Sequence, residues 1–334
     1  MALRIGDHNE TVRQWRRIMA ARFAGYARTL GPLPTDTDVF GARAAAWQQE
    51  YERRTGQPVD GIVSDGDLLA LGIPPNPTPV LPLFFTVEGH QSDMFRGPVA
   101  DTATILETEG RCHHLPTFYN NGAIPFDNQS GVQELARRVG QTVQDNGVPF
   151  PAGTPFMLGG FSQGMIVLYD FIEQYLMPGK PLAWRMPDFR GGLFYGNPCR
   201  ATGSIAPWAV SGISKPNTHG LDPYKRFGAP GCVPVLPNTM DVYREGDIFA
   251  ENGDDQASEM KAAVYQAVAR GHLFVNPISL ARKIAGLFTP SFDEVLGVVM
   301  AIWSGVSFLG DNPNPHYSAF ELDGGIAWAR ERLA

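Results

Sequence analysis

The sequence contains few cysteines and no long hydrophobic run. Its three cysteines, Cys112, Cys199 and Cys232, are widely spaced. One bridge could form, but an odd count argues against a disulfide framework and favours buried or inert thiols. No run reaches the roughly 18 apolar residues of a membrane-spanning helix, and the first residues lack the apolar core and cleavage site of a signal peptide. We therefore expect a protein that is soluble in the cytoplasm where it is made and needs another factor to let it out.

An excess of basic residues is also absent. The 334 residues carry 34 acidic side chains against 27 Lys and Arg, a net charge of −7, so we expect no nucleic-acid partner. His113 and His114 are adjacent and would point to opposite faces of a strand, and neither a His-Glu-x-x-His motif nor a glycine-rich phosphate loop occurs. The acidic stretch from Asp60 to Asp67 lacks EF-hand spacing and indicates a turn. We expect neither a metal nor a cofactor.

Residues 1–73 predict a small helical domain. The apolar residues of segments 12–19 and 42–51 fall on single helical faces, and both Trp15 and Trp47 belong to these faces. The two tryptophans are therefore more typical of a core than of a sugar-stacking site. The segment resembles the peptidoglycan-binding domain of bacterial and phage wall hydrolases, which implies peptidoglycan as a partner. The resemblance is carried by Val39-Phe40-Gly41, Trp47-Gln48, Gly56, Val59-Asp60-Gly61-Ile62-Val63, Leu68 and Leu71.

A proline-rich linker, residues 74–79, predicts an extended spacer before a second domain, residues 80–334. Strand patterns alternate with helical patterns along this second domain, which predicts an α/β fold with a parallel, doubly wound sheet. Residues 199–236 are rich in Gly, Pro and Ser and indicate a long loop. The expected strands are 81–87, 113–119, a run beginning at 156, 192–195 and 240–244, and the expected helices include 98–108 and 129–144.

The most informative stretch is residues 156–169. An apolar run leads into Gly160-Phe161-Ser162-Gln163-Gly164, and apolar residues at helical spacing follow. This layout predicts a nucleophile elbow, a sharp strand-to-helix turn with a serine at its tip. Such a turn requires a sparsely populated backbone conformation at Ser162, and side chains at Gly160 and Gly164 would collide with the neighbouring strand and helix. A glycine turn without chemistry is the alternative, which the apolar flanks disfavour.

A serine nucleophile needs a base and an orienting carboxylate, and in α/β-hydrolases the order along the chain is serine, acid, histidine. Only His272 and His316 come late enough. His272 lies within a helical pattern, whereas His316 lies on an Asn/Pro loop before the last helix, so we predict His316 as the base. Asp247 follows the 240–244 strand at a Gly-Asp turn. We predict it as the acid, ahead of Asp241, Asp254 and Asp255.

The tetrahedral intermediate of acyl transfer requires two hydrogen-bond donors. We predict the backbone N–H of Gln163, the residue after the nucleophile, as the first donor. The second should come from the loop after the first strand, through the backbone of His90 or Gln91. His90 precedes Ser162 in the chain, which argues against a role as the catalytic base.

Residues 256–309 are mostly helical in pattern and strongly apolar, with Leu287, Phe288, Ile302 and Trp303 among them. Ordinary core packing explains such a segment. A lid or groove wall for a greasy substrate explains it equally well, so both interpretations stay open.

Residues 80–334 resemble the lysin B family of mycobacteriophages, which are mycolyl-arabinogalactan esterases related to cutinases. The resemblance implies a cutinase-like α/β-hydrolase fold, a helical insertion at 256–309, and Ser162, Asp247 and His316 as nucleophile, acid and base. It rests on Phe85-Thr86-Val87-Glu88-Gly89, Ala100-Asp101-Thr102-Ala103, Gly160-Phe161-Ser162-Gln163-Gly164, Phe194-Tyr195-Gly196-Asn197-Pro198, Gly246-Asp247-Ile248-Phe249-Ala250 and Pro315-His316-Tyr317.

The chain departs from that pattern at two places. The family often has His-Gly-Thr after the first strand, where this chain has Glu88-Gly89-His90. Cutinases often carry a cysteine shortly after the catalytic Gly-Asp, where this chain has Ala250. The first departure leaves open which residue supplies the second oxyanion donor. Because of the second departure, we do not expect a cutinase-type disulfide.

The resemblance implies a phage lysis enzyme that hydrolyses the ester between mycolic acids and arabinogalactan in the mycobacterial envelope. Such an enzyme would be made in the infected host's cytoplasm and would act at the envelope after release. The alternatives are a general lipase or cutinase-like esterase, a peptidase that uses the same triad, and a non-catalytic wall-binding protein.

Overall fold

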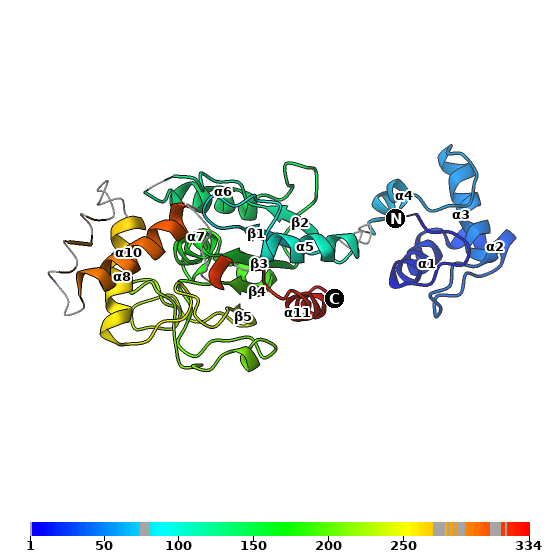
Figure 1. Cartoon of the computed structure of the whole chain (residues 1–334). Coiled ribbons are helices and arrows are strands. Elements are labelled where there is room, and N and C mark those ends of the chain that lie inside the picture. Colours follow the sequence, from blue (N-terminus) through cyan, green and yellow to red (C-terminus); the bar gives the residue numbers. More distant parts are fainter. Residues whose placement is uncertain are drawn as a thin grey trace. The chain divides into compact units, whose positions relative to one another are not determined.

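The computed structural model describes residues 2–73, 81–123, 125–269, 278, 281–282, 285, 291–307, 315–317 and 319–334. The chain divides into two compact units, Met1–Val80 and Leu81–Ala334, whose elements are labelled in Figure 1. The proline-rich segment 74–79, predicted as a linker, lies outside the described residues. Each unit has hydrophobic core residues of its own.

The first unit is built from helices around an aromatic core. Trp15 and Trp47 are 0% and 1% exposed, so they are core residues and not a sugar-stacking surface. Ser64 caps the last helix, and the Asp67 side chain accepts a hydrogen bond from the Ser64 backbone, so this acidic segment forms a helix cap. The helices are α1 (Glu10–Arg22), the 3-10 helix η1 (Ala24–Tyr26), α2 (Ala27–Leu30), α3 (Ala42–Thr55) and α4 (Asp65–Leu71).

The second unit is organised around a five-stranded sheet in which every neighbouring pair is parallel, in the order β2-β1-β3-β4-β5. This confirms the predicted α/β fold. The order reverses between β1 and β3, and open α/β sheets bind ligands outside the carboxyl ends of the strands at such a switch point. The strands are β1 (Leu83–Val87), β2 (His113–Pro116), β3 (Phe156–Phe161), β4 (Phe189–Tyr195) and β5 (Thr239–Val242).

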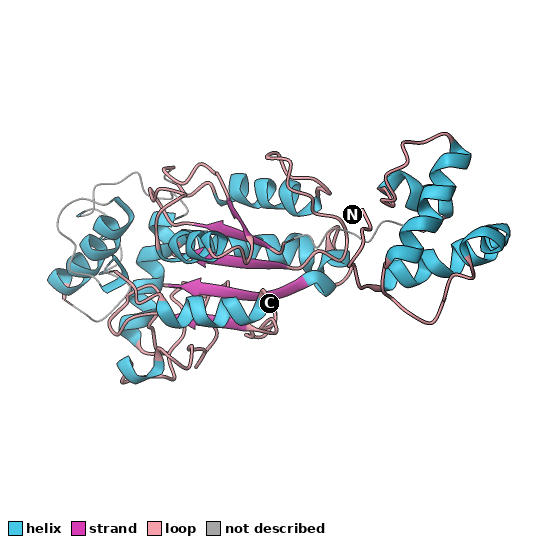
Figure 2. Cartoon of the chain, turned by 90° about the vertical axis from the view of Figure 1, so that its right-hand side faces the viewer, coloured by secondary structure: helices cyan, strands magenta, loops and turns pink. Residues whose placement is uncertain are grey.

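Helices cover both faces of this sheet, as Figure 2 shows. In β1 the side chains of Leu83, Phe85 and Val87 belong to one core and that of Phe84 to another, as the two-residue period of a strand requires. Residues of α6 (Asn128–Gly140) and α7 (Gln163–Phe171) complete the first core. Residues of α5 (Pro98–Thr108) and α11 (Asp323–Arg332) complete the second.

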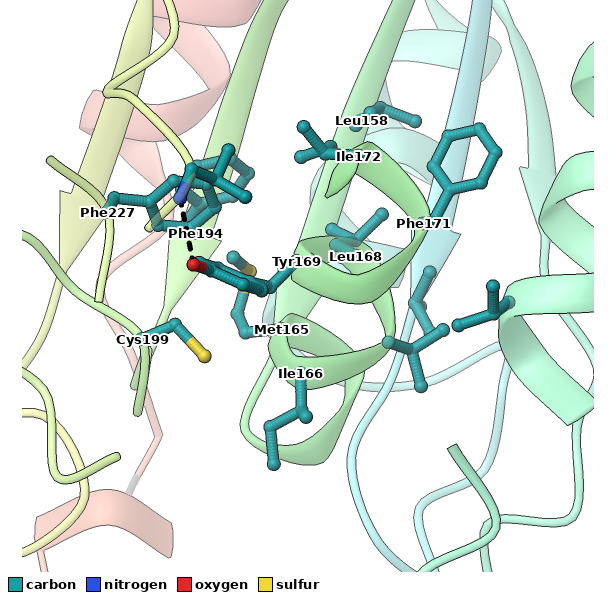
Figure 3. Packing of buried hydrophobic residues seen from close by; sticks show 14 of the residues in the cluster. Leu158, Met165, Ile166, Leu168, Tyr169, Phe171, Ile172, Phe194, Cys199 and Phe227 are labelled. Atoms are coloured by element: carbon teal, nitrogen blue, oxygen red, sulfur yellow. Dashed lines mark hydrogen bonds between the residues drawn. The ribbon is translucent and has the colours of Figure 1, made fainter. Parts of the chain in front are cut away.

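Helix α7 is buried on all sides, since each of its residues is buried. Figure 3 shows its side chains packed among apolar residues that include Phe194 and Phe227. The backbone N–H of Val233 donates to the hydroxyl of Tyr169 at 2.9 Å, which satisfies that hydroxyl within the core. The helix continues as a π-helical turn, Ile172–Leu176. A helix fixed in this way holds the residue at its amino end, Ser162, in one position.

Two strands end earlier than predicted. The strand expected over 113–119 ends at Pro116, because the following residues bind the loop after β1: the Tyr119 hydroxyl donates to the Glu88 carbonyl. The strand expected over 240–244 ends at Val242, and the chain then turns, with the Asp247 N–H donating to the Arg244 carbonyl. Both strands therefore give way to loops at the carboxyl edge of the sheet.

The predicted long loop and the helical insertion are partly described. Residues 199–236 contain no helix or strand other than the 3-10 turn η4 (Val210–Gly212), after the 3-10 helix η3 (Ala183–Asp188). The insertion contributes α8 (Gln256–Ala269) and α10 (Phe292–Ser307). Leu287 and Phe288, and the side chains of Ile302 and Trp303, lie outside the described part. Among the described residues, no helix has the length and apolar character needed to cross a membrane.

The described apolar residues of the insertion serve partly as core. Val264, Val295 and Val299 are buried in the same core as α7. Phe292 and Met300 are 37% and 46% exposed. Core packing therefore accounts for one face of this insertion, and a lid role for the other face stays a prediction.

We expect opposite effects from two helical glycine substitutions. In Gly164→Ala the new Cβ would overlap the carbonyl oxygen of Val87 at the end of β1, which should lower the free energy of unfolding by about 3 kcal/mol. A Cβ added at Gly297 in α10 would meet open space, so Gly297→Ala should raise the free energy of unfolding by up to about 1 kcal/mol. Urea denaturation of both variants measures the difference, and equal effects would contradict the close approach at Gly164.

Candidate active site

Ser162 occupies the turn between β3 and α7, with φ 54° and ψ −121°. Non-glycine residues rarely adopt a positive φ, so this conformation stores strain that the surrounding packing must hold. The packing is tight on both sides. A Cβ on Gly160 would lie 2.5 Å from the sulfur of Met165, and one on Gly164 would overlap the backbone after β1. Glycine is required at both positions, and the partly exposed serine is presented at the carboxyl edge of the sheet.

Three side chains far apart in the sequence meet at this serine. The His316 Nε2 atom lies 2.8 Å from the Ser162 Oγ atom. On the other side of the ring, Nδ1 lies 2.9 and 3.0 Å from the two carboxylate oxygens of Asp247. Because a carboxylate only accepts hydrogen bonds, Nδ1 carries the hydrogen and Nε2 accepts the serine proton. The structure thus brings together Ser162, His316 and Asp247, the predicted nucleophile, base and acid, although their catalytic roles remain a prediction.

The imidazole of His316 is held on every side. It stacks on Phe161 with ring centroids 4.9 Å apart, and Phe249 lies at 4.6 Å. A Cβ on Gly196 would come within 2.5 Å of its Cε1 atom. Asp247 is fixed in turn, because its Oδ1 atom accepts the backbone N–H groups of Phe249 and Ala250. Both partners are 0% exposed, so the pair keeps one geometry in a site that excludes water.

The other candidate acids and the other late histidine lie elsewhere. Asp241 accepts hydrogen bonds from the Asn197 amide and the Ser204 hydroxyl. Asp254 interacts with His219 at 3.1 Å, and its side chain is largely exposed. His272, the rejected candidate base, falls outside the described residues.

The loop after β1 passes directly beside the serine. A Cβ on Gly89 would lie 3.0 Å from the Ser162 Cβ, and the His90 ring nitrogen Nδ1 lies 3.3 Å from the Gln163 side-chain oxygen. The backbone N–H of Gln91 donates to the Asn121 carbonyl at 3.1 Å, so that group is already engaged. The backbone of His90 as the second oxyanion donor stays a prediction. The first, Gln163, begins α7, where backbone N–H groups favour negative charge.

A buried carboxyl group, Glu88, anchors the same loop. Its side chain is almost fully buried, and its Oε1 atom accepts the Ala100 N–H at 2.8 Å in the first turn of α5. The Cα of Gly97, at φ 138°, packs onto this carboxyl so closely that a Cβ there would overlap it. In the sequence, Glu88 stands within a family motif and at a departure from the family's usual pattern, and neither predicts a buried acid. The available signal was an acidic residue directly after an apolar strand, where water cannot solvate a charge.

Burial raises the pKa of Glu88 to about 8, and the nearby Asp101 and Asp93 carboxylates act in the same direction. Backbone N–H groups at the start of α5 oppose the shift only in part. Burial also raises the pKa values of the Tyr119 and Tyr195 hydroxyls, and the charge of Glu88 acts in the same direction. Glu88 is therefore largely protonated at neutral pH.

The remaining candidate groups are possible metal ligands and the three cysteines. Within the described ranges, no cluster of three or more His, Cys, Asp or Glu residues is arranged to hold a metal ion. Cys112 and Cys199 are buried, Cys232 is partly buried, and all three are free thiols. Burial raises the pKa of Cys112 to about 12, which keeps that thiol protonated and unreactive.

The fold of the chain is similar to that of lysin B from mycobacteriophage D29, with a TM-score of 0.56 and 20% sequence identity over 75% of this chain and 99% of that one. Two further solved structures give TM-scores below 0.5 at 15% identity. A cutinase-like protein from Cryptococcus sp. matches 68% of this chain and 94% of its own (TM-score 0.37). The catalytic core domain of acetyl xylan esterase from Trichoderma reesei matches 58% and 97% (TM-score 0.35).

No protein-family model matches the chain, and a search of curated proteins found no match. At 20% identity, the similarity to lysin B shows the fold alone. What the site can do chemically is inferred from its geometry.

We expect Glu88→Gln to change the pH dependence of stability. An acid whose pKa rises on folding favours the native state at low pH, and this contribution is lost as pH rises from about 4.5 to about 8. Glutamine keeps the acceptor for the Ala100 N–H and cannot ionise. The free energy of unfolding of the variant should therefore rise relative to that of the wild type by a few kcal/mol over that interval. Urea denaturation at pH 5, 7 and 9 measures this change. A constant difference at all three pH values would contradict the buried, protonated state.

Proposed function

We propose that the chain is a serine esterase that hydrolyses the ester between mycolic acids and arabinogalactan in the mycobacterial envelope. The observation that carries the catalytic part is the hydrogen-bonded sequence Ser162, His316, Asp247, at 2.8 and 2.9 Å, on a strained strand-to-helix turn. These groups supply a nucleophile, a base and an orienting carboxylate, which is the set that acyl transfer from a hydroxyl group requires.

In the proposed reaction, the Ser162 oxygen attacks the acyl carbon while His316 Nε2 takes the serine proton. Asp247 stabilises the imidazolium that forms and keeps its orientation. The imidazolium then gives its proton to the leaving alcohol oxygen as the carbon–oxygen bond breaks, which leaves an acyl-enzyme. Water, deprotonated by His316, releases the carboxylic acid and restores the serine.

The backbone donors near the serine are suited to the charge that develops on the carbonyl oxygen. Gln163 lies at the amino end of a fully buried helix, and His90 lies on a loop that Glu88, Tyr119 and Asn121 hold in place. Donors held in advance need no reorganisation during the reaction, which makes such sites effective.

The substrate assignment is supported by the sequence resemblance to lysin B proteins and by the shared fold. The first unit, through its resemblance to peptidoglycan-binding domains, would tether the enzyme to the wall and raise its local concentration near the ester. The protein would be made in the cytoplasm of an infected host and would reach the envelope after release.

A general lipase or cutinase-like esterase is the second candidate. It is favoured by an exposed pair of aromatic rings, Phe95 and Phe118, 5.4 Å apart on the loops after β1 and β2, which could contact free lipid. Comparing the products released from purified mycolyl-arabinogalactan with those released from triglyceride separates the two candidates.

We expect Ser162→Ala to lower the hydrolysis of p-nitrophenyl butyrate by about 10⁴-fold or more, because the nucleophile is lost. A fluorophosphonate probe should label the wild type and fail to label the variant. Ser291→Ala, which removes a serine at the start of α10, serves as the matched control and should be labelled like the wild type. Undiminished turnover by a folded Ser162→Ala protein would refute the proposed nucleophile.

Asp247→Asn tests the orienting carboxylate separately. The amide can donate a hydrogen to Nδ1 and so favour the wrong tautomer, and kcat should fall by about 10⁴-fold. Asp254→Asn, at a solvent-exposed aspartate that interacts with His219, should retain wild-type turnover. If the two variants show the same kcat, Asp247 is not the catalytic acid.

A further inference from the structure

A hydrogen bond between two side chains joins the loop after β1 to the turn that carries the serine. Strands β1 and β3 pair in parallel as far as Val87 and Gly160. Three residues further along each segment, the His90 Nδ1 atom lies 3.3 Å from the Gln163 Oε1 atom. Both side chains are buried. The two segments are therefore joined through side chains just beyond the point at which their backbone pairing ends.

The direction of this hydrogen bond follows from a third residue, Asn128, at the start of α6. The amide nitrogen Nε2 of Gln163 donates to the Asn128 side-chain oxygen at 2.9 Å. The amide oxygen of Gln163 is thereby left to face the imidazole of His90. Because an amide oxygen only accepts hydrogen bonds, the His90 Nδ1 atom carries the hydrogen. The three side chains form one chain of hydrogen bonds, from His90 through Gln163 to Asn128.

The segment that supplies Asn128 also holds the imidazole. The ring of Phe126 lies against the ring of His90, with centroids 5.0 Å apart. Between Phe126 and Asn128, the Asp127 side chain accepts the backbone N–H of Ser130 and so caps α6. One short segment, tied to a helix, therefore contacts both members of the His90–Gln163 pair.

The pair consists of the two residues whose backbone N–H groups are the proposed oxyanion donors. Such donors must lie about 2.7–3.1 Å from the position that the charged oxygen takes, and a misplacement of about 1 Å can lower the rate by about 100-fold. The N–H of Gln163 belongs to a helix that is buried along its whole length, whereas that of His90 belongs to a loop. A direct link between the two residues limits how far one donor can move relative to the other.

We propose that the hydrogen-bonded side chains of His90 and Gln163 position the loop after β1 against the amino end of α7 and so set the spacing of the two oxyanion donors. Gln163 then acts in two ways, as a donor through its backbone and as a positioning residue through its side chain. This inference rests on the proposed esterase function, because it concerns the charge that develops during acyl transfer.

Two substitutions remove the hydrogen bond and keep both backbone N–H groups. His90→Phe retains a ring against Phe126, and Gln163→Met retains the length of the side chain. With p-nitrophenyl butyrate, each should lower kcat by about tenfold and change KM by less than about twofold, because the donors act mainly in the transition state. Gln129→Met, at an exposed glutamine that follows Asn128 in the chain, should match the wild type.

A transition-state analogue gives a readout that a merely structural role would not move. Butylboronic acid forms a tetrahedral adduct with an activated serine, and one of its oxygens takes the place of the oxyanion. Its affinity should fall in His90→Phe and Gln163→Met by the same factor as kcat/KM. Unchanged affinity for the boronic acid, with a lowered kcat, would contradict a role at the oxyanion.

Combining His90→Phe with Gln163→Met tests whether the two side chains act through one bond. The double variant should then lower kcat by about as much as either single variant, about tenfold. A loss of about 100-fold, the product of two independent effects, would overturn the inference, as would wild-type kcat in both single variants. Asn128→Ala, which removes the partner of the Gln163 amide and alters neither donor residue, should lower kcat about threefold. This variant gives the test if urea denaturation shows that His90→Phe is unfolded, and wild-type kcat in it would then overturn the inference.

The outcomes separate this inference from the proposed function. If the wild type hydrolyses p-nitrophenyl butyrate and Ser162→Ala does not, the esterase stands whatever the pair variants show. Wild-type kinetics in the pair variants would then overturn the positioning role alone. A folded wild type without ester turnover would overturn the esterase and the positioning role together.

Discussion

The strained backbone of Ser162 is the constraint on which the second unit depends. Its positive φ is held because α7 is buried along its whole length and because Gly164 lets that helix approach the end of β1. A turn of this kind persists only where the surrounding structure over-determines it. The parallel sheet, the apolar core around α7 and the glycines of the turn therefore act together, and their combined effect is one position for one hydroxyl group.

The same packing explains how a polar hydrogen-bonded chain can exist inside the protein. His316 and Asp247 are both fully buried, and an isolated charge there would be strongly unfavourable. Each polar atom instead has a partner: the imidazole has the serine and the carboxylate, and the carboxylate also has the N–H groups of Phe249 and Ala250. The Glu88 carboxyl is buried differently: no described residue pairs a cation with it, and burial keeps it largely protonated at neutral pH.

Much of this site could be predicted because its signals are local. Ser162 is flanked by glycines and apolar residues, Asp247 follows a strand, and His316 precedes the last helix, so local pattern and chain order together select them. The hydrogen bonds that hold the loop after β1 could not be predicted, because they come from Tyr119 and Asn121, which lie far along the chain from that loop. The end of β2 at Pro116 could not be predicted for the same reason, because the Tyr119 hydroxyl beyond it binds the distant Glu88 carbonyl, and local propensity does not encode such a contact.

The surfaces around the reacting groups are harder to predict than the groups themselves. The exposed rings of Phe95 and Phe118 follow β1 and β2, whereas the charged residues Arg244 and Glu245 follow β5, and no local pattern joins these segments. The parallel sheet brings them to one edge, because the carboxyl ends of its strands meet there. Their position at the edge that carries the serine therefore follows from the topology of the sheet and not from local sequence.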